Sequence, residues 1–135
     1  MRLRVIPTSV HSAVDHVVGP ALIAAPSILG LDRTSPEGIV PRVNGIAAAL
    51  YSNLTDYELS VKNVIPMKLH LALDAMSGAA LAAVPLATGA RQRGTRHWLP
   101  HAALGAFEIG MALFTQTQAP KSRSRRFGRV LRLAK

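Results

Sequence analysis

Two stretches of the chain repeat one another, and this repeat constrains the fold more than any other feature. Residues 5–30 and 64–89 align without a gap at a shift of 59 positions, and 12 of the 26 aligned residues are identical. A repeat of this length indicates that the chain is built from two copies of one structural unit. The matched residues include Pro7/Pro66, His11/His70, Asp15/Asp74, Gly19/Gly78, Pro26/Pro85 and Gly30/Gly89.

Each repeated stretch is apolar and long enough to form a helix that crosses a lipid bilayer. About 23 residues at 1.5 Å each span roughly 34 Å, more than the ~30 Å of bilayer hydrocarbon. A second apolar stretch follows each copy, so the sequence predicts four helices, over residues 7–29, 36–55, 66–88 and 98–117. We therefore expect an all-α fold, a four-transmembrane-helix bundle made of two tandem, parallel two-helix repeats.

The domain organisation follows from the repeat. Residues 1–119 should form one four-helix transmembrane domain, with repeat 1 at about residues 5–57 and repeat 2 at about residues 64–117, and residues 120–135 should form a basic cytoplasmic tail. Because each unit would cross the membrane twice, a pseudo-two-fold axis along the membrane normal should relate the two units.

A soluble four-helix bundle is the alternative fold. Its helices would each need a polar face opposite an apolar stripe, yet residues 21–31 and 79–90 carry no charge at all. The mean hydropathy is +0.23 although the formal net charge is +9, so the charged residues are segregated from the apolar ones. This segregation favours the membrane protein.

The basic residues predict the orientation in the membrane. The side with the N-terminus, the connector between the repeats and the tail carries 11 of the 16 Lys and Arg, and the other side carries five. The positive-inside rule then places both termini in the cytoplasm and the chain in the cytoplasmic (inner) membrane of a bacterium, as a multi-pass protein. Tyr57 and Trp98 are expected at the two membrane interfaces, as in an aromatic belt.

The positive charge does not indicate nucleic-acid binding, because the basic residues flank apolar segments and no nucleic-acid-binding motif is present. The tail is expected either to set the topology or to lie on anionic lipid. Its candidate lipid-binding residues are Lys121, Arg123, Arg125, Arg126, Arg129 and Arg132.

Each repeat places a histidine and an aspartate one helical turn apart. His11 and Asp15 share one helix face, as His70 and Asp74 do, and small residues continue both faces. Small residues allow close helix packing in membranes, which places these faces in the bundle interior. The aspartates could accept hydrogen bonds from their own histidine, or from a Ser, Asn or Tyr of the second or fourth helix, and so lock the packing.

The same pairs also suit other functions, which the sequence leaves open. Two histidines related by the pseudo-two-fold could bind one divalent metal ion together with the aspartates, or could ligate a haem. Asp/His pairs inside a membrane are also typical groups of proton and ion pathways. No cofactor is predicted outright, so a haem or a divalent metal at His11 and His70 stays an alternative.

Glu108 is expected near the centre of the fourth helix and has no acidic counterpart, because the matched residue is Ala48. It is predicted to be a proton carrier or a third carboxylate beside the pairs, or else a carboxyl group that is protonated or is hydrogen-bonded to the second helix, for example to Asn44 or Asn53. Two further histidines are expected outside the site: a partly solvated His101 and a packing or surface His16.

The doubled pattern of His, Asp and Gly four residues apart, followed by Pro, resembles the SPW-repeat family of small bacterial membrane proteins. The match covers His11, Asp15, Gly19 and Pro26, then His70, Asp74, Gly78 and Pro85. The Ser and Trp that flank the proline in that family are absent from both copies. The resemblance implies a membrane protein of tandem two-helix units and implies no particular activity.

We therefore expect a small multi-pass membrane protein with a non-enzymatic structural or interaction role and buried His/Asp pairs. The alternative is a membrane-embedded metal- or haem-binding protein, or a proton- or ion-translocating one. The chain has no cysteine and no motif of the hydrolase, kinase or dehydrogenase families. The expected partner is the lipid bilayer, and a homo-oligomer is compatible with four short spans.

Overall fold

The structure, a computed structural model, describes residues 3–118, and four α-helices account for most of them. The helices are α1 (Thr8–Ile28), α2 (Pro36–Ser52), α3 (Met67–Thr88) and α4 (Thr95–Phe114), with a short 3-10 helix, η1 (Ala90–Arg93), before α4. Within residues 3–118 there are isolated β-bridges but no strands. The all-α, four-helix prediction is therefore confirmed. The candidate lipid-binding residues of the tail lie outside the described residues.

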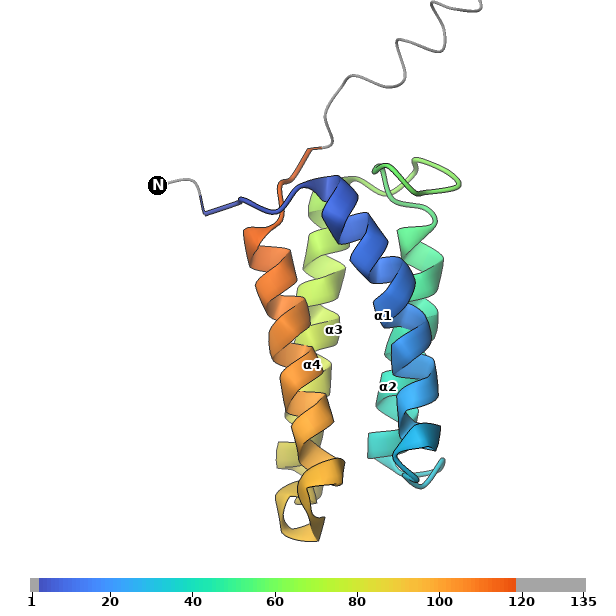
Figure 1. Cartoon of the computed structure of the whole chain (residues 1–135), viewed down its shortest axis with the longest axis vertical. Coiled ribbons are helices and arrows are strands. Elements are labelled where there is room, and N and C mark those ends of the chain that lie inside the picture. The colour runs from blue at the N-terminus through green and yellow to red at the C-terminus, as the bar shows by residue number, and fades with distance from the viewer. Residues whose placement is uncertain (1–2, 119–135) are drawn as a thin grey trace, which may run out of the picture.

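The helices form two hairpins that lie side by side (Figure 1). α1 packs against α2, α3 packs against α4, and the two hairpins meet mainly along α2 and α3. We call the end of the bundle with residues 53–66 the connector end, and the end with the turns at residues 29–35 and 89–94 the turn end. The segments that precede α1 and follow α4 lie at the connector end (Figure 1).

Proline starts both long helices in the same way. Pro7 and Pro66 are the N-cap residues, in an extended conformation with φ of −63° and −62°. Their carbonyl oxygens accept hydrogen bonds from the backbone N–H groups of His11 and His70, each 3.1 Å long. The histidines therefore lie in the first turn of α1 and of α3.

The other two helices differ from the predicted boundaries. α2 ends at Ser52 rather than at residue 55, because the backbone then turns to pair with the start of the second hairpin. α4 begins at Thr95 and ends at Phe114, about three residues earlier at each end than predicted. The loop expected before α4 is partly taken up by η1.

Short backbone pairings close the connector end. Ile6 pairs with Thr115, which joins the start of α1 to the end of α4, and Thr55 pairs with Ile65, which joins the end of α2 to the start of α3. The two pairings use matched residues of the two halves. The two hairpins are therefore joined at equivalent positions of the two repeats.

Glycines set the distance between the helices of each hairpin. A Cβ atom on Gly45 would lie 2.6 Å from the carbonyl oxygen of Gly19, and one on Gly105 would lie 2.5 Å from that of Gly78. Such contacts are sterically excluded, so the helices approach this closely only with glycine at these positions. The small-residue faces predicted to lie in the interior do lie there.

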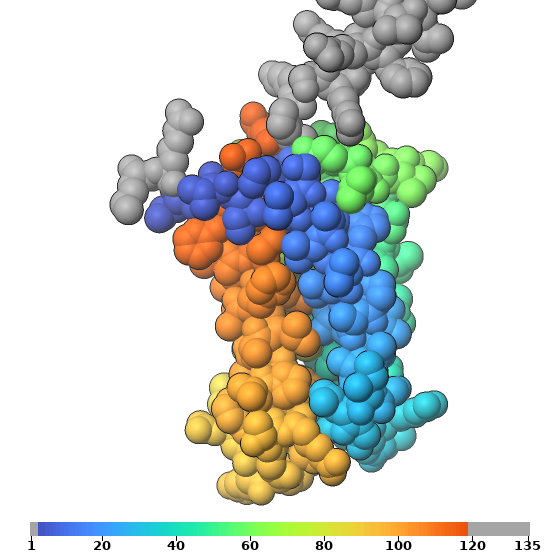
Figure 2. Space-filling view, in the orientation of Figure 1, coloured from blue at the N-terminus to red at the C-terminus, as the bar shows by residue number. Residues whose placement is uncertain are grey.

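The interior is unusually polar and the surface unusually apolar. Among the described residues, the buried side chains include four ionisable groups of the helix interiors, His11, His70, Asp74 and Glu108. By contrast, α1 and α4 border an open groove whose walls are mainly valine side chains and Phe107 (Figure 2).

By length and composition, α3 alone of the described helices is apolar enough to cross a membrane. The four-span prediction therefore stays a prediction.

Candidate metal centre

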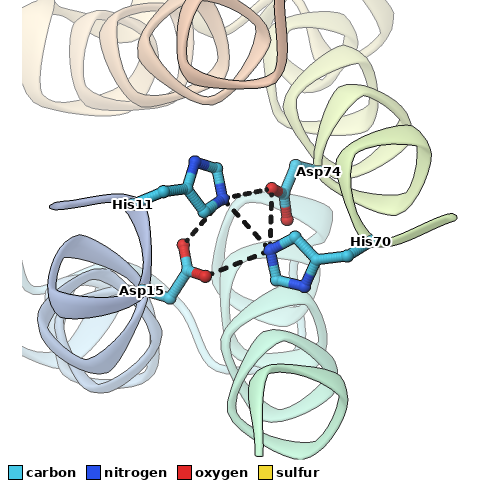
Figure 3. A group of neighbouring side chains, drawn as sticks. All are labelled: His11, Asp15, His70 and Asp74. Carbon is cyan, nitrogen blue, oxygen red and sulfur yellow. Dashed lines mark hydrogen bonds and ion pairs between the residues drawn. The ribbon is translucent and has the colours of Figure 1, made fainter. Parts of the chain in front are cut away.

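Four side chains meet at the connector end, two from each hairpin. His11 and Asp15 project from α1, and His70 and Asp74 project from α3 (Figure 3). Each residue offers one nitrogen or carboxylate oxygen, and these four atoms all lie within 4.8 Å of one another. The predicted pairs are thus brought together into one group, which we call the His/Asp cluster.

The contacts within the His/Asp cluster cross between the two helices. The Nε2 atom of His11 lies 2.9 Å from Oδ2 of Asp74, and Nε2 of His70 lies 3.1 Å from Oδ2 of Asp15. Within each helix, the histidine and aspartate are 3.4 Å and 3.2 Å apart. The two Nε2 atoms face each other at 3.1 Å. Both histidines are fully buried, so water does not screen these contacts.

Two threonines hold the far side of the imidazole rings. The Nδ1 atom of His11 lies 2.8 Å from Oγ1 of Thr115, and Nδ1 of His70 lies 2.8 Å from Oγ1 of Thr55. Each threonine belongs to the hairpin opposite its histidine and follows the second helix of that hairpin, Thr115 directly after α4 and Thr55 three residues after the end of α2. The threonines therefore fix the orientation of both rings while joining the hairpins.

The contacts of Thr55 also determine the tautomer of His70. The Thr55 hydroxyl donates its single hydrogen to the backbone oxygen of Tyr51, 2.7 Å away. It must then accept a hydrogen bond from Nδ1–H of His70. In a neutral ring, Nε2 consequently has a lone pair that points at carboxylate oxygens. Only an added proton or a cation makes those contacts attractive.

Two tyrosines complete the surroundings of the carboxylates. The Tyr51 hydroxyl donates to Oδ1 of Asp74 over 2.6 Å, and the Tyr57 hydroxyl donates to Oδ2 of Asp15 over 3.0 Å. The predicted hydrogen bond from a tyrosine of the second helix is thus confirmed for Asp74. Burial, together with the nearby Asp15 carboxylate, raises the pKa of the Tyr57 hydroxyl, which therefore stays protonated and remains a donor.

The expected interface position of Tyr57 is wrong. Tyr57 is buried, in contact with the His/Asp cluster and in a small apolar core with Met67, Leu71 and Ala112. The reason is that α2 ends early and the connector folds back over the interior. Thr8 at the start of α1 fixes this connector by donating a hydrogen bond to Glu58 over 2.8 Å.

Glu108 lies beside the His/Asp cluster rather than within it. It lines a small cavity together with His11, Asp15 and Asp74, on the side that faces α4. Its Oε2 atom is buried and has no hydrogen-bond partner among residues 3–118. The expected bond to an asparagine of α2 is not formed, because Asn44 donates to the backbone oxygen of Ser77 instead.

A second buried polar group lies at the turn end. Glu37 is buried and forms ion pairs with Arg93 and with His97. Its backbone oxygen accepts a hydrogen bond from Nε2 of His101 over 2.9 Å. The partly solvated position expected for His101 is therefore wrong, because this residue lies on the buried face of α4 together with Gly105 and Glu108. His16 is exposed, as predicted.

Three residues of these two groups were not predicted from the sequence, namely Thr55, Thr115 and Glu37. Thr55 and Thr115 are matched between the repeats, which could have marked them, although threonine at a helix end is common for other reasons. Glu37 offered no such sign, since an acidic residue in the first turn of a helix is ordinary. Comparisons of the chain with protein-family models, with curated proteins and with solved structures found no match.

Proposed function

We propose that this chain is a small multi-pass membrane protein in which one divalent metal ion joins the two hairpins. The ligands are His11, Asp15, His70 and Asp74, and the role of the ion is structural rather than enzymatic. The observation that carries the proposal is the convergence of four ligand atoms, two from each hairpin, on one space.

The spacing of these atoms suits a tetrahedral ion. Zn²⁺ binds imidazole nitrogen and carboxylate oxygen at about 2.0–2.2 Å, so neighbouring ligand atoms of a tetrahedron lie roughly 3.3–3.6 Å apart. The nitrogen–oxygen and nitrogen–nitrogen contacts in the cluster are 2.9–3.4 Å, with Asp15 using Oδ1 toward His11 and Oδ2 toward His70. All four ligand atoms lie within 4.8 Å of one another, so side-chain rotations that bring them to equal spacing around an ion would complete such a site.

The charges and the hydrogen bonds around the ligands support the same ion. Two aspartates balance a divalent cation, so a bound ion leaves no net charge in the interior. Thr55 and Thr115 bond the outward nitrogen of each imidazole, and Tyr51 and Tyr57 bond the carboxylates. Partners of this kind orient the ligands of metal sites and strengthen binding.

A metal-free network of ion pairs is the second candidate, favoured by the four His–Asp contacts of the cluster. If both histidines were protonated, each would lie between two carboxylates. The two Nε2–H groups would then both point into one space, with the nitrogens only 3.1 Å apart. That contact is repulsive between two cations, and for this reason we favour the metal ion.

A haem or a pathway through the bundle has less support. Two nitrogens 3.1 Å apart leave no room for a porphyrin between them. Along the bundle, the fully buried side chains of Leu22 and Leu81 separate the His/Asp cluster from the polar group at the turn end.

The surface supports the membrane part of the proposal. Large apolar side chains are exposed on all four helices while ionisable ones are buried, which is the reverse of the usual soluble arrangement. Lipid would cover these side chains. They include Val10, Val17, Ile28, Val43, Ile46, Leu50, Leu69, Met76, Leu86 and Leu113.

Several finer points rest on the sequence alone. They are the inner-membrane location with cytoplasmic termini, the lipid-binding tail, homo-oligomers and the relationship to the SPW-repeat family. Washing membranes from expressing cells with alkaline carbonate tests the first of these. We expect the chain to stay in the membrane pellet, and its release into the supernatant would contradict the membrane assignment.

Metal content tests the site. The protein, expressed without a polyhistidine tag and purified in mild detergent, should contain about one divalent metal ion per chain by elemental analysis. His11→Ala should abolish this ion. His16→Ala, which removes an exposed histidine from the same helix, should retain it. A metal-free wild-type protein that also fails to take up Zn²⁺ would favour the ion-pair network.

A further inference from the structure

We propose that the metal site has a fifth, exchangeable ligand position on the side that faces α4, occupied by a water molecule that Glu108 holds. This inference rests on the metal site proposed above and concerns what else that site can bind. An exchangeable position is the feature that separates a reactive metal site from a purely structural one.

The first observation is the cavity itself. His11, Asp15 and Asp74 line it on one side, and Glu108 lines it on the other. Its volume is about 20 Å³, and about 10–15 Å³ is enough for one water molecule. Figure 3 shows α4 at the top of the view, beyond His11 and Asp74. The space therefore adjoins three of the four proposed ligands.

The second observation is the state of Glu108. Only 8% of this residue is exposed, and Oε2 has no partner within residues 3–118. Leaving a buried polar oxygen unpaired costs about 1–3 kcal/mol. A water molecule in the cavity would provide the missing hydrogen bond.

The asymmetry of the cavity indicates which side is polar. Ala48, the residue matched to Glu108 in the first half, lines the same cavity and offers no polar atom. Most of the remaining wall is apolar, with Val14, Val18 and Phe107. The polar side chains that line the cavity are Glu108, Tyr51 and those of the ligand cluster, and these are the partners open to a water molecule there. It is therefore placed to bind a metal ion and the carboxyl group together.

A water molecule in this position would have defined chemistry. Binding to a divalent ion makes the water more acidic, and a carboxylate within hydrogen-bond reach can accept its proton. The site would accept small ligands that replace this water, such as azide.

Cobalt substitution tests the inference, because the visible spectrum of Co²⁺ differs between four- and five-coordinate sites. We expect the full-length protein to bind one Co²⁺ per chain with a five-coordinate spectrum that changes on addition of azide. Ala48→Leu, which fills the cavity from the wall opposite Glu108, should keep the Co²⁺ but give a four-coordinate spectrum without an azide response. Glu108→Leu should do the same, and Glu108→Gln, which can still hold water, should resemble the wild type.

The outcomes separate the two proposals. One bound Co²⁺ with a four-coordinate spectrum that azide does not change would show a closed site, which overturns the exchangeable position and leaves the structural metal ion standing. Absence of bound Co²⁺ in the wild type would overturn both. Measuring Co²⁺ stoichiometry in each variant shows that its bundle is still assembled.

Discussion

At the connector end the two hairpins are joined by residues that occur in matched pairs, whereas at the turn end they are joined by residues without counterparts. The His/Asp cluster repeats each of its ligands at a shift of 59 positions. Glu37 at the turn end would be matched by Arg96, and the contact between Glu37 and Arg93 has no equivalent in the other half. The centre at the connector end is thus built from residues that occur twice in the sequence, and the contacts at the turn end are built from residues that occur once.

The two ends also differ in how they balance charge. The Arg93 side chain that pairs with Glu37 is 47% exposed, so water screens this ion pair. The histidines of the cluster are fully buried, and their contacts are unscreened. We therefore expect the connector end to determine the stability of the bundle and the turn end to add little.

The largest effect should come from removing one ligand. Asp74→Ala removes one carboxylate partner from both buried histidines and leaves the Tyr51 hydroxyl without its acceptor, and breaking a buried ionic group costs about 3–5 kcal/mol. Unfolding in mixed detergent should show this loss, together with the loss of bound metal. Asp56→Ala, in the exposed part of the connector, should change the free energy of unfolding by less than about 0.5 kcal/mol. Equal losses in the free energy of unfolding for the two variants would contradict the claim that the His/Asp cluster determines the stability of the bundle.

A smaller effect is expected from the threonines that orient the ligands. Thr115→Val removes the hydrogen-bond partner of His11 while keeping the shape of the side chain. Loss of such a partner typically lowers metal affinity about 10–100-fold. A competition titration of Zn²⁺ against a chelator measures this change. Thr88→Val, which removes a threonine hydroxyl from the turn end of α3 rather than from the connector end, should leave the affinity unchanged.

The close packing of α3 against α4, between the two ends of the bundle, gives a reference change in stability that involves no charged side chain. Gly105→Ala places a Cβ atom 2.5 Å from the Gly78 oxygen, and such overpacking costs about 1–3 kcal/mol. Gly110→Ala on the same helix meets no atom within 4 Å and should be neutral or stabilise the helix by up to about 1 kcal/mol. Both variants should keep the metal ion, and its loss from either would contradict the account.

The smallest effect is expected at the turn end. Glu37→Gln weakens the contacts with Arg93 and His97 but keeps a hydrogen-bonding side chain, so the loss should be about 1 kcal/mol. Metal content should not change, because Leu22 and Leu81 separate the two ends. A loss of metal in this variant would show that the two ends are coupled.

The four helices and the His/Asp cluster could be predicted because the sequence repeat and the helical period identify the same interior face on α1 and on α3. His11 and Asp15 are one turn apart, and the glycines and prolines that follow mark that face as the interior. Because the matched residues of α3 obey the same period, their convergence with those of α1 could also be predicted. Predicting the cluster therefore required no knowledge of loop conformation.

The remaining residues depend on how non-helical backbone folds, which periodicity does not describe. Tyr57 reaches Asp15 only because α2 ends at Ser52 and the connector turns inward. The position of Tyr57 follows from tertiary contacts, and a sequence pattern alone gives no reason to expect it. His101, by contrast, lies on the same buried face of α4 as Gly105 and Glu108, so helical period could have marked it as interior.

X-ray absorption at the zinc edge tests the central claim most directly. The protein would be loaded with one equivalent of Zn²⁺ and dialysed against metal-free buffer. We predict retained zinc with nitrogen and oxygen ligands at about 2.0–2.2 Å, two of which show the scattering of imidazole rings. Zinc that is lost on dialysis, or bound zinc without two imidazoles, would contradict the proposal that His11 and His70 join the hairpins through a metal ion.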